Sequence, residues 1–272
     1  IIEAGGRLVR ITAPGVKEAE MLGEIHRRLR ERGYTTPISA DIHFVAEAAS
    51  VAARYVEKVR INPGNFADKR ATFKKLTYTD EEYAAELEIL RQKFTEFLEV
   101  CRQYGTAVRI GTNHGSLSDR IMSRYGDTPA GMVEATMEYL RVCQACDFKD
   151  VVISLKSSDC RTMVDAVRLL VEKMEAEGMC YPLHLGVTEA GEGEDGRIRS
   201  AVGIGTLLNE GIGDTIRVSL TGDPVEEIKS ARQILKTLGL RKGGVEVVSC
   251  PTCGRTRIDL IHLANQVETM VS

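Results

Sequence analysis

Four segments of the sequence repeat one pattern: a branched aliphatic residue, an arginine, a second branched aliphatic residue, then a small or polar residue. They are Val9-Arg10-Ile11-Thr12, Val59-Arg60-Ile61-Asn62, Val108-Arg109-Ile110-Gly111 and Ile216-Arg217-Val218-Ser219. Successive side chains of a β-strand point to opposite faces, so each arginine shares a face with the small or polar residue. Because an unpartnered buried charge is costly, these arginines require either carboxylates or an anionic ligand.

Other strand-like segments show the same alternation, and they add a lysine and two acids to the polar face. The cations on this face are Arg10, Arg60, Arg109, Lys156 and Arg217. Ion pairing within the protein is one interpretation, but Asp41 and Glu189 are too few to balance them. The alternative is a site that binds a diphosphate or similar polyanion by bidentate, charge-assisted hydrogen bonds of about 1.5–3 kcal/mol each.

Strand-like and helix-like segments alternate along the chain, which predicts an α/β fold with a parallel sheet. Strands are expected at 8–12, 38–44, 58–62, 107–112, 151–156, 183–188, 215–220 and 245–249, and helices at 17–32, 80–104, 129–146, 160–177 and 224–238. This number of strands in a chain of this length favours a TIM-type (β/α) barrel. An open doubly wound sheet is less consistent, because its strands are buried on both faces and apolar throughout. Residues 186–196, rich in Gly, Glu and Asp, are expected to form a mobile loop.

The carboxyl ends of the strands form the active-site face of a barrel. Asp41, His43, Asn62, Asn113, Lys156, Glu189 and Ser219 are expected to gather there. A lone histidine is more often a packing residue than a catalyst, and only His43 is given a site role. Glu189 lies in a loop at a strand end, and a carboxylate among arginines would stay ionised or protonate a leaving oxygen.

A Cys-Pro-Thr-Cys-Gly-Arg segment at 250–255 is typical of a metal knuckle. Cys250 and Cys253 could both face one metal, and the motif occurs in zinc and iron–sulfur sites alike. Two ligands do not complete such a site. The other Cys-x-x-Cys pair, Cys143 and Cys146, is expected to pack within a helix. The missing ligands are therefore expected beyond Ser272 or in another subunit.

The composition excludes several classes of protein. The 272 residues are 43% hydrophobic with a net charge of −3, which is enough apolar content for a core and gives no basic excess for nucleic acid. No apolar run reaches the roughly 18 residues of a membrane span, and no signal peptide opens the chain. Seven scattered cysteines favour a reducing compartment, in the cytosol or an organelle matrix.

Six blocks closely resemble the 4-hydroxy-3-methylbut-2-enyl diphosphate synthase family of the non-mevalonate (MEP) isoprenoid pathway. The blocks are ADIHF at 40–44, RINPGN at 60–65, RIGTNHGS at 109–116, HLGVTEAG at 184–191, GDTIRVSL at 213–220 and CPTCGR at 250–255. The resemblance implies an oxidoreductase, cytoplasmic or in the plastid stroma, with a TIM-type barrel followed by an iron–sulfur α+β domain.

The resemblance also implies a substrate, a cofactor and residue roles. The barrel would bind 2-C-methyl-erythritol 2,4-cyclodiphosphate, whose ring is opened by two electrons from ferredoxin or flavodoxin with loss of water. Arg10, Arg60, Arg109, Lys156, Arg217 and Ser219 would hold the diphosphate, and His43 and Asn113 would line the pocket. Glu189 would be the catalytic acid. Cys250 and Cys253 would be two of the three cysteine ligands of a 4Fe-4S cluster, and a homodimer is expected.

By this resemblance residues 1–243 form the substrate barrel and residues 244–272 begin the cluster domain. The family's first barrel strand is expected before Ile1 and its third cluster cysteine after Ser272. Segment 245–249 then leads into the cluster domain, no domain is inserted before it, and the chain alone is expected to be inactive. Two alternatives stay open: a redox-independent phosphate-ester or pterin-type transferase on the same barrel, and a phosphometabolite-binding protein stabilised by zinc.

Overall fold

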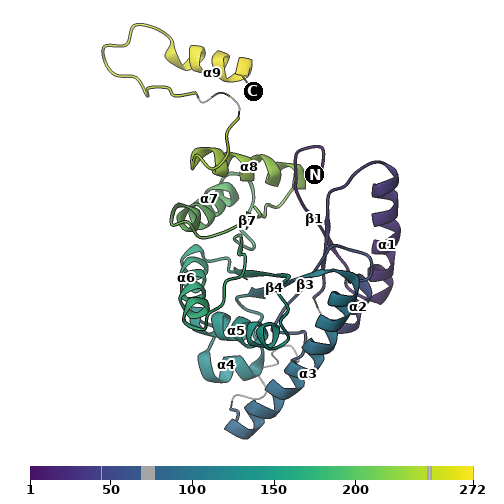
Figure 1. The fold of residues 1–272 in the computed structure, drawn as a ribbon. Coiled ribbons are helices and arrows are strands. Elements are labelled where there is room, and N and C mark those ends of the chain that lie inside the picture. The colour runs from purple at the N-terminus through teal and green to yellow at the C-terminus, as the bar shows by residue number, and fades with distance from the viewer. Residues whose placement is uncertain (44, 69–76, 244, 246, 272) are drawn as a thin grey trace. The chain divides into compact units, whose positions relative to one another are not determined.

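The computed structural model describes residues 1–43, 45–68, 77–243, 245 and 247–271 (Figure 1). The chain divides into two compact units, Ile1–Ala231 and Arg232–Ser272. None of the helices in the described ranges has the length and apolar content of a membrane span. The larger unit contains all the described strands and positions the predicted substrate-binding and catalytic residues, whereas Cys250 and Cys253 lie in the smaller unit.

The strands of the larger unit are parallel and follow one another in chain order. β1 (Val9–Thr12), β2 (Ile38–Asp41), β3 (Lys58–Ile61), β4 (Ala107–Asn113) and β5 (Val151–Lys156) form a sheet in the order β1-β2-β3-β4-β5. β6 (His184–Leu185) pairs with β7 (Thr215–Ile216), and an isolated parallel bridge between Ile153 and Leu183 joins the two sheets. This sequential parallel order is that of a TIM-type barrel, as the sequence predicted. Within the described residues no pairing joins β7 to β1.

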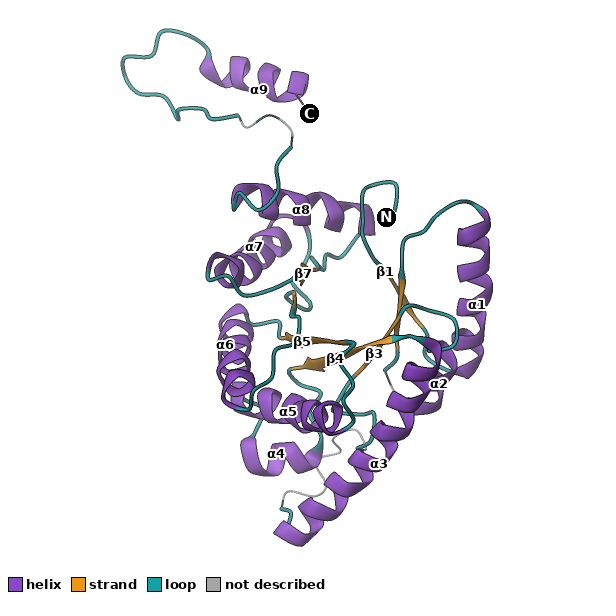
Figure 2. Cartoon of the chain, viewed as in Figure 1, coloured by secondary structure: helices purple, strands orange, loops and turns teal. Residues whose placement is uncertain are grey.

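Helices lie between successive strands and around the outside of the sheet (Figure 2). They are α1 (Val16–Glu31), α2 (Ala46–Ala52), α3 (Asp80–Tyr104), α4 (Asp119–Tyr125), α5 (Pro129–Ala145), α6 (Cys160–Ala176), α7 (Gly193–Asn209) and α8 (Pro224–Thr237). The longest, α3, begins with a capping box between Thr79 and Glu82, and it ends at Gly105, whose φ of 67° suits a glycine.

The aliphatic faces of β3 and β4 pack against the helices. Val59, Ile61, Val108 and Ile110 are fully buried. The arginines that alternate with them therefore lie on the opposite face, which is the interior of the barrel. This is the arrangement that the period-two pattern predicted.

Several predicted elements differ from the structure. β6 and β7 have two residues each where 183–188 and 215–220 were expected as strands, because the following residues turn away into loops that carry site residues. α7 begins at Gly193, inside the expected loop 186–196, with Glu194 and Asp195 in its first turn, where acids favour a helix. α2 and α4 were not predicted.

The prediction of a strand at 245–249 is wrong for residues 245 and 247–249, which are not in a strand. Glu246 lies outside the described ranges. A strand needs a neighbour to pair its backbone groups, and the described part of the smaller unit contains no strand. That unit includes α9 (Leu260–Val271), in which no described residue is buried. Phe44, the last residue expected in the second strand, also lies outside the described ranges.

Candidate anion-binding site

Asp41, at the end of β2, is the fully buried acid around which one side of the site is built. Arg10 Nη1 donates to its Oδ2 at 2.6 Å, and Arg60 Nη1 donates to its Oδ1 at 3.0 Å. His43 Nε2 lies 3.5 Å from Oδ2. Burial alone would raise the pKa of Asp41, but the hydrogen bond from His43 and the charges of Arg60 and Arg10 outweigh it and hold this pKa well below its usual range. Asp41 is therefore ionised and shared between two arginines.

Arg60 is only 3% exposed, and the glycine on the next strand leaves room for it. Its Nη2 donates to the carbonyl oxygen of Gly111 at 2.7 Å, and a Cβ at Gly111 would lie 2.4 Å from Arg60 Nε. Arg60 Nε is buried with no hydrogen-bond partner. A buried N–H of a charged group normally has a partner. Arg60 Nε is therefore an unsatisfied buried donor beside Gly111.

Arg109 and Lys156 are buried cations without carboxylate partners among the described residues. They are 5% and 8% exposed, and Arg109 Nη1 donates to Ser154 Oγ at 3.0 Å. Gly186 directly follows β6, and a Cβ there would lie 3.1 Å from Lys156 Nζ. The absence of a side chain at Gly186 therefore leaves room for the Lys156 amino group. Burial, and then the charges of Arg109 and Arg217, lower the pKa of Lys156 well below its usual value. This part of the barrel has a surplus of positive charge.

Arg217 follows β7 and pairs with an acid that the sequence analysis did not select. Its Nη2 lies 3.3 Å from Glu227 Oε1 and 3.4 Å from Oε2. The Leu220 backbone N–H also donates to Glu227 Oε1, at 3.1 Å. Ser219, between Arg217 and Leu220, is half-buried. Glu227 lies in the first turn of α8, and no signal in the local sequence separates it from Glu226.

Lys58 is a further inward cation that the sequence analysis did not select. It precedes Arg60 by two residues on β3 and so lies on the same face. Burial, together with the charge of Arg109, lowers the pKa of Lys58 to about 8. The described interior thus holds six cations and two acids. The cations are Arg10, Lys58, Arg60, Arg109, Lys156 and Arg217, and the acids are Asp41 and Glu227.

His184, on β6, is buried among these cations. Its Nδ1 lies 2.9 Å from Thr215 Oγ1. Burial, then the charges of Lys156 and Arg109, lower the pKa of His184 well below its usual value. The imidazole is therefore neutral near pH 7 and adds hydrogen-bonding capacity without adding charge.

The loops after β3 and β4 are fastened to each other beside the half-buried Asn113. Asn62 Nδ2 donates to Ser116 Oγ at 3.1 Å, and Ser116 Oγ donates to the Asn113 carbonyl oxygen at 3.0 Å. A Cβ at Gly64 would lie 1.6 Å from the Ser116 carbonyl oxygen, a separation that only glycine allows. The close approach fixes the backbone that carries Asn113.

Glu189 lies in the loop after β6, and its side chain is not among the ion pairs of the described residues. It is exposed, and its φ is +51°, in the left-handed region. This conformation costs a non-glycine residue about 1–2 kcal/mol. Backbone bonds hold the loop on both sides, from Thr188 N to Ser157 O and from Thr221 N to Gly191 O, each 3.1 Å long. The expected pairing of Glu189 with the arginines is absent here, and Glu227 provides the second acid instead.

Cys250 and Cys253 are exposed free thiols in the smaller unit. Hydrogen bonds from the backbone and side chain of Arg255, and from Thr256, lower the pKa of Cys253, which favours the thiolate that metals bind. The described residues contain no group of three or more His, Cys, Asp or Glu side chains arranged for a metal ion. The donor type fits an iron–sulfur or zinc site, and the described thiols supply two ligands.

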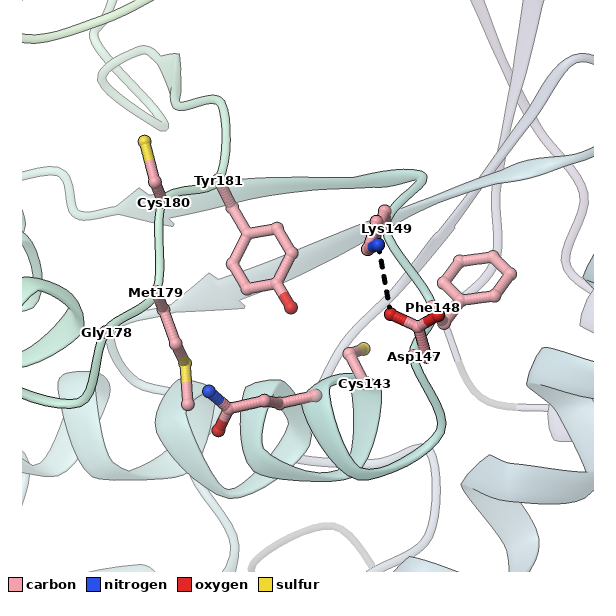
Figure 3. A pocket seen from close by; sticks show the side chains of 9 residues that line it. Cys143, Asp147, Phe148, Lys149, Gly178, Met179, Cys180 and Tyr181 are labelled. Carbon is pink, nitrogen blue, oxygen red and sulfur yellow. Dashed lines mark ion pairs between the residues drawn. The ribbon is translucent and has the colours of Figure 1, made fainter.

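A cavity of about 330 Å³ lies away from these residues, at the amino ends of β5 and β6 (Figure 3). Its lining includes Cys143, Cys180 and Tyr181, with an ion pair of 3.1 Å between Lys149 and Asp147. None of the predicted site residues lines it. In barrel enzymes the chemistry lies at the opposite, carboxyl ends of the strands.

Comparisons with known proteins identify relatives of this barrel. A sequence model described as the GcpE TIM-barrel domain matches residues 1–232. A curated protein of Parabacteroides distasonis, named 4-hydroxy-3-methylbut-2-en-1-yl diphosphate synthase (flavodoxin), is 65% identical over 86% of this chain and 38% of its own length. The chloroplastic, ferredoxin-type synthase of Oryza sativa subsp. japonica is 53% identical over 92% of this chain and 34% of its own length. The chain thus spans less than two fifths of either relative.

Solved structures of low sequence identity share the fold. D-allulose 3-epimerase from Methylomonas sp. gives a TM-score of 0.54 at 11% identity, over 87% of this chain and 88% of that one. An L-ribulose 3-epimerase gives 0.53 at 15% identity, over 100% and 89%. At these identities the likeness concerns the barrel alone.

Proposed function

The chain belongs to the GcpE TIM-barrel domain family, and on this premise we propose that its barrel binds the cyclic diphosphate substrate of 4-hydroxy-3-methylbut-2-enyl diphosphate synthesis. One observation carries the proposal: Arg109 and Lys156 are almost fully buried and have no carboxylate partner among the described residues. Buried cations without acids are costly, and a bound diphosphate would neutralise them.

The proposed roles follow the contacts. Arg60 and Arg109 have unused N–H donors, and the Lys156 amino group lies beside Gly186, where a bound anion would favour its protonated form. We assign to these groups, together with Arg10, Arg217 and Ser219, the binding of phosphoryl oxygens, and to His43 and Asn113 the lining of the substrate pocket. Charge-assisted bonds of this type are worth about 1.5–3 kcal/mol each.

We propose Glu189 as the acid that protonates the departing hydroxyl group. The reaction that this family membership supports is a two-electron reductive ring opening, in which a C–O bond to phosphate breaks and a hydroxyl group leaves as water. The left-handed backbone of Glu189 supports a functional role, because strained residues persist where the surrounding structure holds them and are common at active sites.

A 4Fe-4S cluster, when bound, would deliver the electrons to the substrate. In this chain Cys250 and Cys253 would be two of its ligands, with the third expected downstream of Ser272. Ferredoxin or flavodoxin would supply the electrons, as the names of the relatives indicate for those proteins. We further propose a homodimer, located in the cytoplasm or the plastid stroma.

Isothermal titration calorimetry with 2-C-methyl-erythritol 2,4-cyclodiphosphate tests the proposal on the 272-residue chain. The double variant Arg109→Met/Lys156→Met should weaken binding by at least about a hundredfold, since two charge-assisted bonds are lost. Lys149→Met, which removes a lysine whose side chain is 80% exposed, is the matched control. Absence of binding by the wild-type chain, or equal binding by the double variant, would refute the proposed site.

Anaerobic reconstitution followed by iron analysis tests the cluster ligands. The isolated chain, with two of the expected cysteine ligands, should not retain a stoichiometric 4Fe-4S cluster. Retention of a full cluster by this chain would contradict the assignment. Bound zinc without a visible chromophore would favour the zinc-stabilised alternative.

A further inference from the structure

Glu227 contacts both ends of the segment that carries two predicted diphosphate ligands. Its carboxylate lies 3.3 and 3.4 Å from Arg217 Nη2, and its Oε1 accepts a hydrogen bond of 3.1 Å from the Leu220 N–H. The Glu227 side chain is 13% exposed. One carboxylate therefore spans the turn from Arg217 to Leu220, with Ser219 inside it.

The same segment is joined to the loop that carries Glu189. Thr221, next to Leu220, donates its N–H to the Gly191 carbonyl oxygen at 3.1 Å. A Cβ at Gly196 would lie 2.7 Å both from Leu220 Cδ2 and from the Gly191 oxygen. Because Gly196 has no side chain, Leu220 and the Gly191 carbonyl oxygen both lie close to the first turn of α7 at this point.

The Glu189 loop needs such support because of its backbone. Glu189 has a φ of +51° and Gly191 a φ of +110°. A strained conformation of about 1–2 kcal/mol persists only when neighbouring contacts hold it. On the carboxyl side of Glu189, the support is the Gly191 oxygen, which is bonded to the segment that Glu227 holds.

We propose that Glu227 is a positioning residue, which fixes Arg217 directly, Ser219 through its neighbour Leu220, and the Glu189 loop through Leu220 and Thr221. It acts through the length and hydrogen-bonding geometry of its side chain. This inference rests on the proposed function for the roles of Arg217, Ser219 and Glu189.

The neighbouring Glu226 separates this role from a general effect of acids at the start of α8. Both acids lie in the first turn of α8, where negative charge favours the helix. Glu226 pairs with Arg197 and Lys229, and it does not contact the segment from Arg217 to Leu220 in the described structure. Glu226→Gln is thus a matched control that keeps Glu227 intact.

The experiment compares Glu227→Gln, which keeps the side-chain length, with Glu227→Asp, which keeps the charge but is one methylene shorter. Three quantities are measured: the Kd for the cyclic diphosphate, hydrogen exchange of the Leu220 and Thr221 amides, and kcat in the full-length enzyme. Glu227→Gln should stay within about threefold of wild type in all three, because its amide oxygen can still accept from Leu220. Glu227→Asp should raise Kd and lower kcat by about tenfold each and speed amide exchange, the loss of about one hydrogen bond.

Wild-type values of Kd, kcat and amide exchange in Glu227→Asp would overturn the inference, because Glu227 would then have no positioning role. Equal losses in Glu227→Gln and Glu227→Asp would also overturn it, because the role would then depend on the charge of the side chain. Damage in Glu226→Gln equal to that in Glu227→Asp would also overturn it. If the wild-type chain does not bind the cyclic diphosphate, the proposed function fails, whereas the amide exchange still decides whether Glu227 holds the two loops.

Discussion

Binding of a diphosphate should be accompanied by uptake of protons, and Lys156 should be the main group that takes them up. Lys156 is 8% exposed, and burial and the charges of Arg109 and Arg217 lower its pKa well below the usual value. Lys58 has a pKa of about 8 for similar reasons. A bound dianion supplies the opposite charge that both groups lack, so it raises their pKa values again.

The number of protons can be worked from these groups. At pH 8 Lys58, with a pKa of about 8, is about half protonated and can take up about half a proton. Lys156 can take up as much as one more. The bound form holds more protons than the free form, so affinity must fall as pH rises, by up to about tenfold per pH unit for each proton. For Lys58 this loss begins near pH 8.

Calorimetric titrations at pH 8 in two buffers of different ionisation enthalpy measure the uptake directly. Wild type should take up about 0.5–1.5 protons per diphosphate, and Lys156→Met should take up only the share of Lys58, about half a proton. Lys149→Met, at an exposed lysine, should behave as wild type. A wild-type binding enthalpy that is the same in both buffers, or a release of protons, would refute the argument that these lysines are uncharged or partly charged before binding.

Three further predictions concern the groups around this site. Asp41→Asn should lower the free energy of unfolding by about 3–5 kcal/mol, because Arg60 loses its buried partner. Since the folded pKa of Asp41 is depressed, the wild-type protein should lose stability below about pH 4. Urea unfolding as a function of pH should show a smaller loss of stability in the variant. Gly111→Ala should cost about 1–3 kcal/mol in the same assay, because its Cβ would lie 2.4 Å from Arg60 Nε, and wild-type stability would contradict the fixed position of Arg60. Glu189→Gly should be more stable than Glu189→Ala by about 1 kcal/mol, since glycine adopts the left-handed φ freely, and both variants should lose turnover in the full-length enzyme.

The sequence predicted the arginine faces because strand alternation is a local property. Arg60 and Arg109 lie where a period of two places them, and Asp41, on the same face of β2, reaches Arg60 across the sheet. The alternation and number of strand-like and helix-like segments predicted the barrel, and the family blocks implied the same fold. These predictions needed only the direction of side chains along each strand.

The remaining site features depend on tertiary structure. Glu227 is one of two consecutive acids in α8, and only the path of the loop after β7 brings it rather than Glu226 to Arg217. Lys58 precedes the repeated four-residue pattern by one position and so is not part of it. Glu189 was expected among the arginines, but a positive φ, which local sequence does not specify for a glutamate, directs its loop.

The distribution of acids also predicts unequal roles for the arginines. On the β1–β3 side, Asp41 is shared by Arg10 and Arg60, whereas on the β4–β5 side the partner of Arg109 among the described residues is a serine, Ser154. Arg10 is also 35% exposed in its side chain, so solvent screens its charge. Arg109→Met should therefore raise the Kd for the cyclic diphosphate by about tenfold more than Arg10→Met, a difference of about 1.4 kcal/mol. Equal losses, or a larger loss for Arg10→Met, would contradict this prediction. The diphosphate would then lie nearer Asp41, in spite of repulsion by the ionised carboxylate.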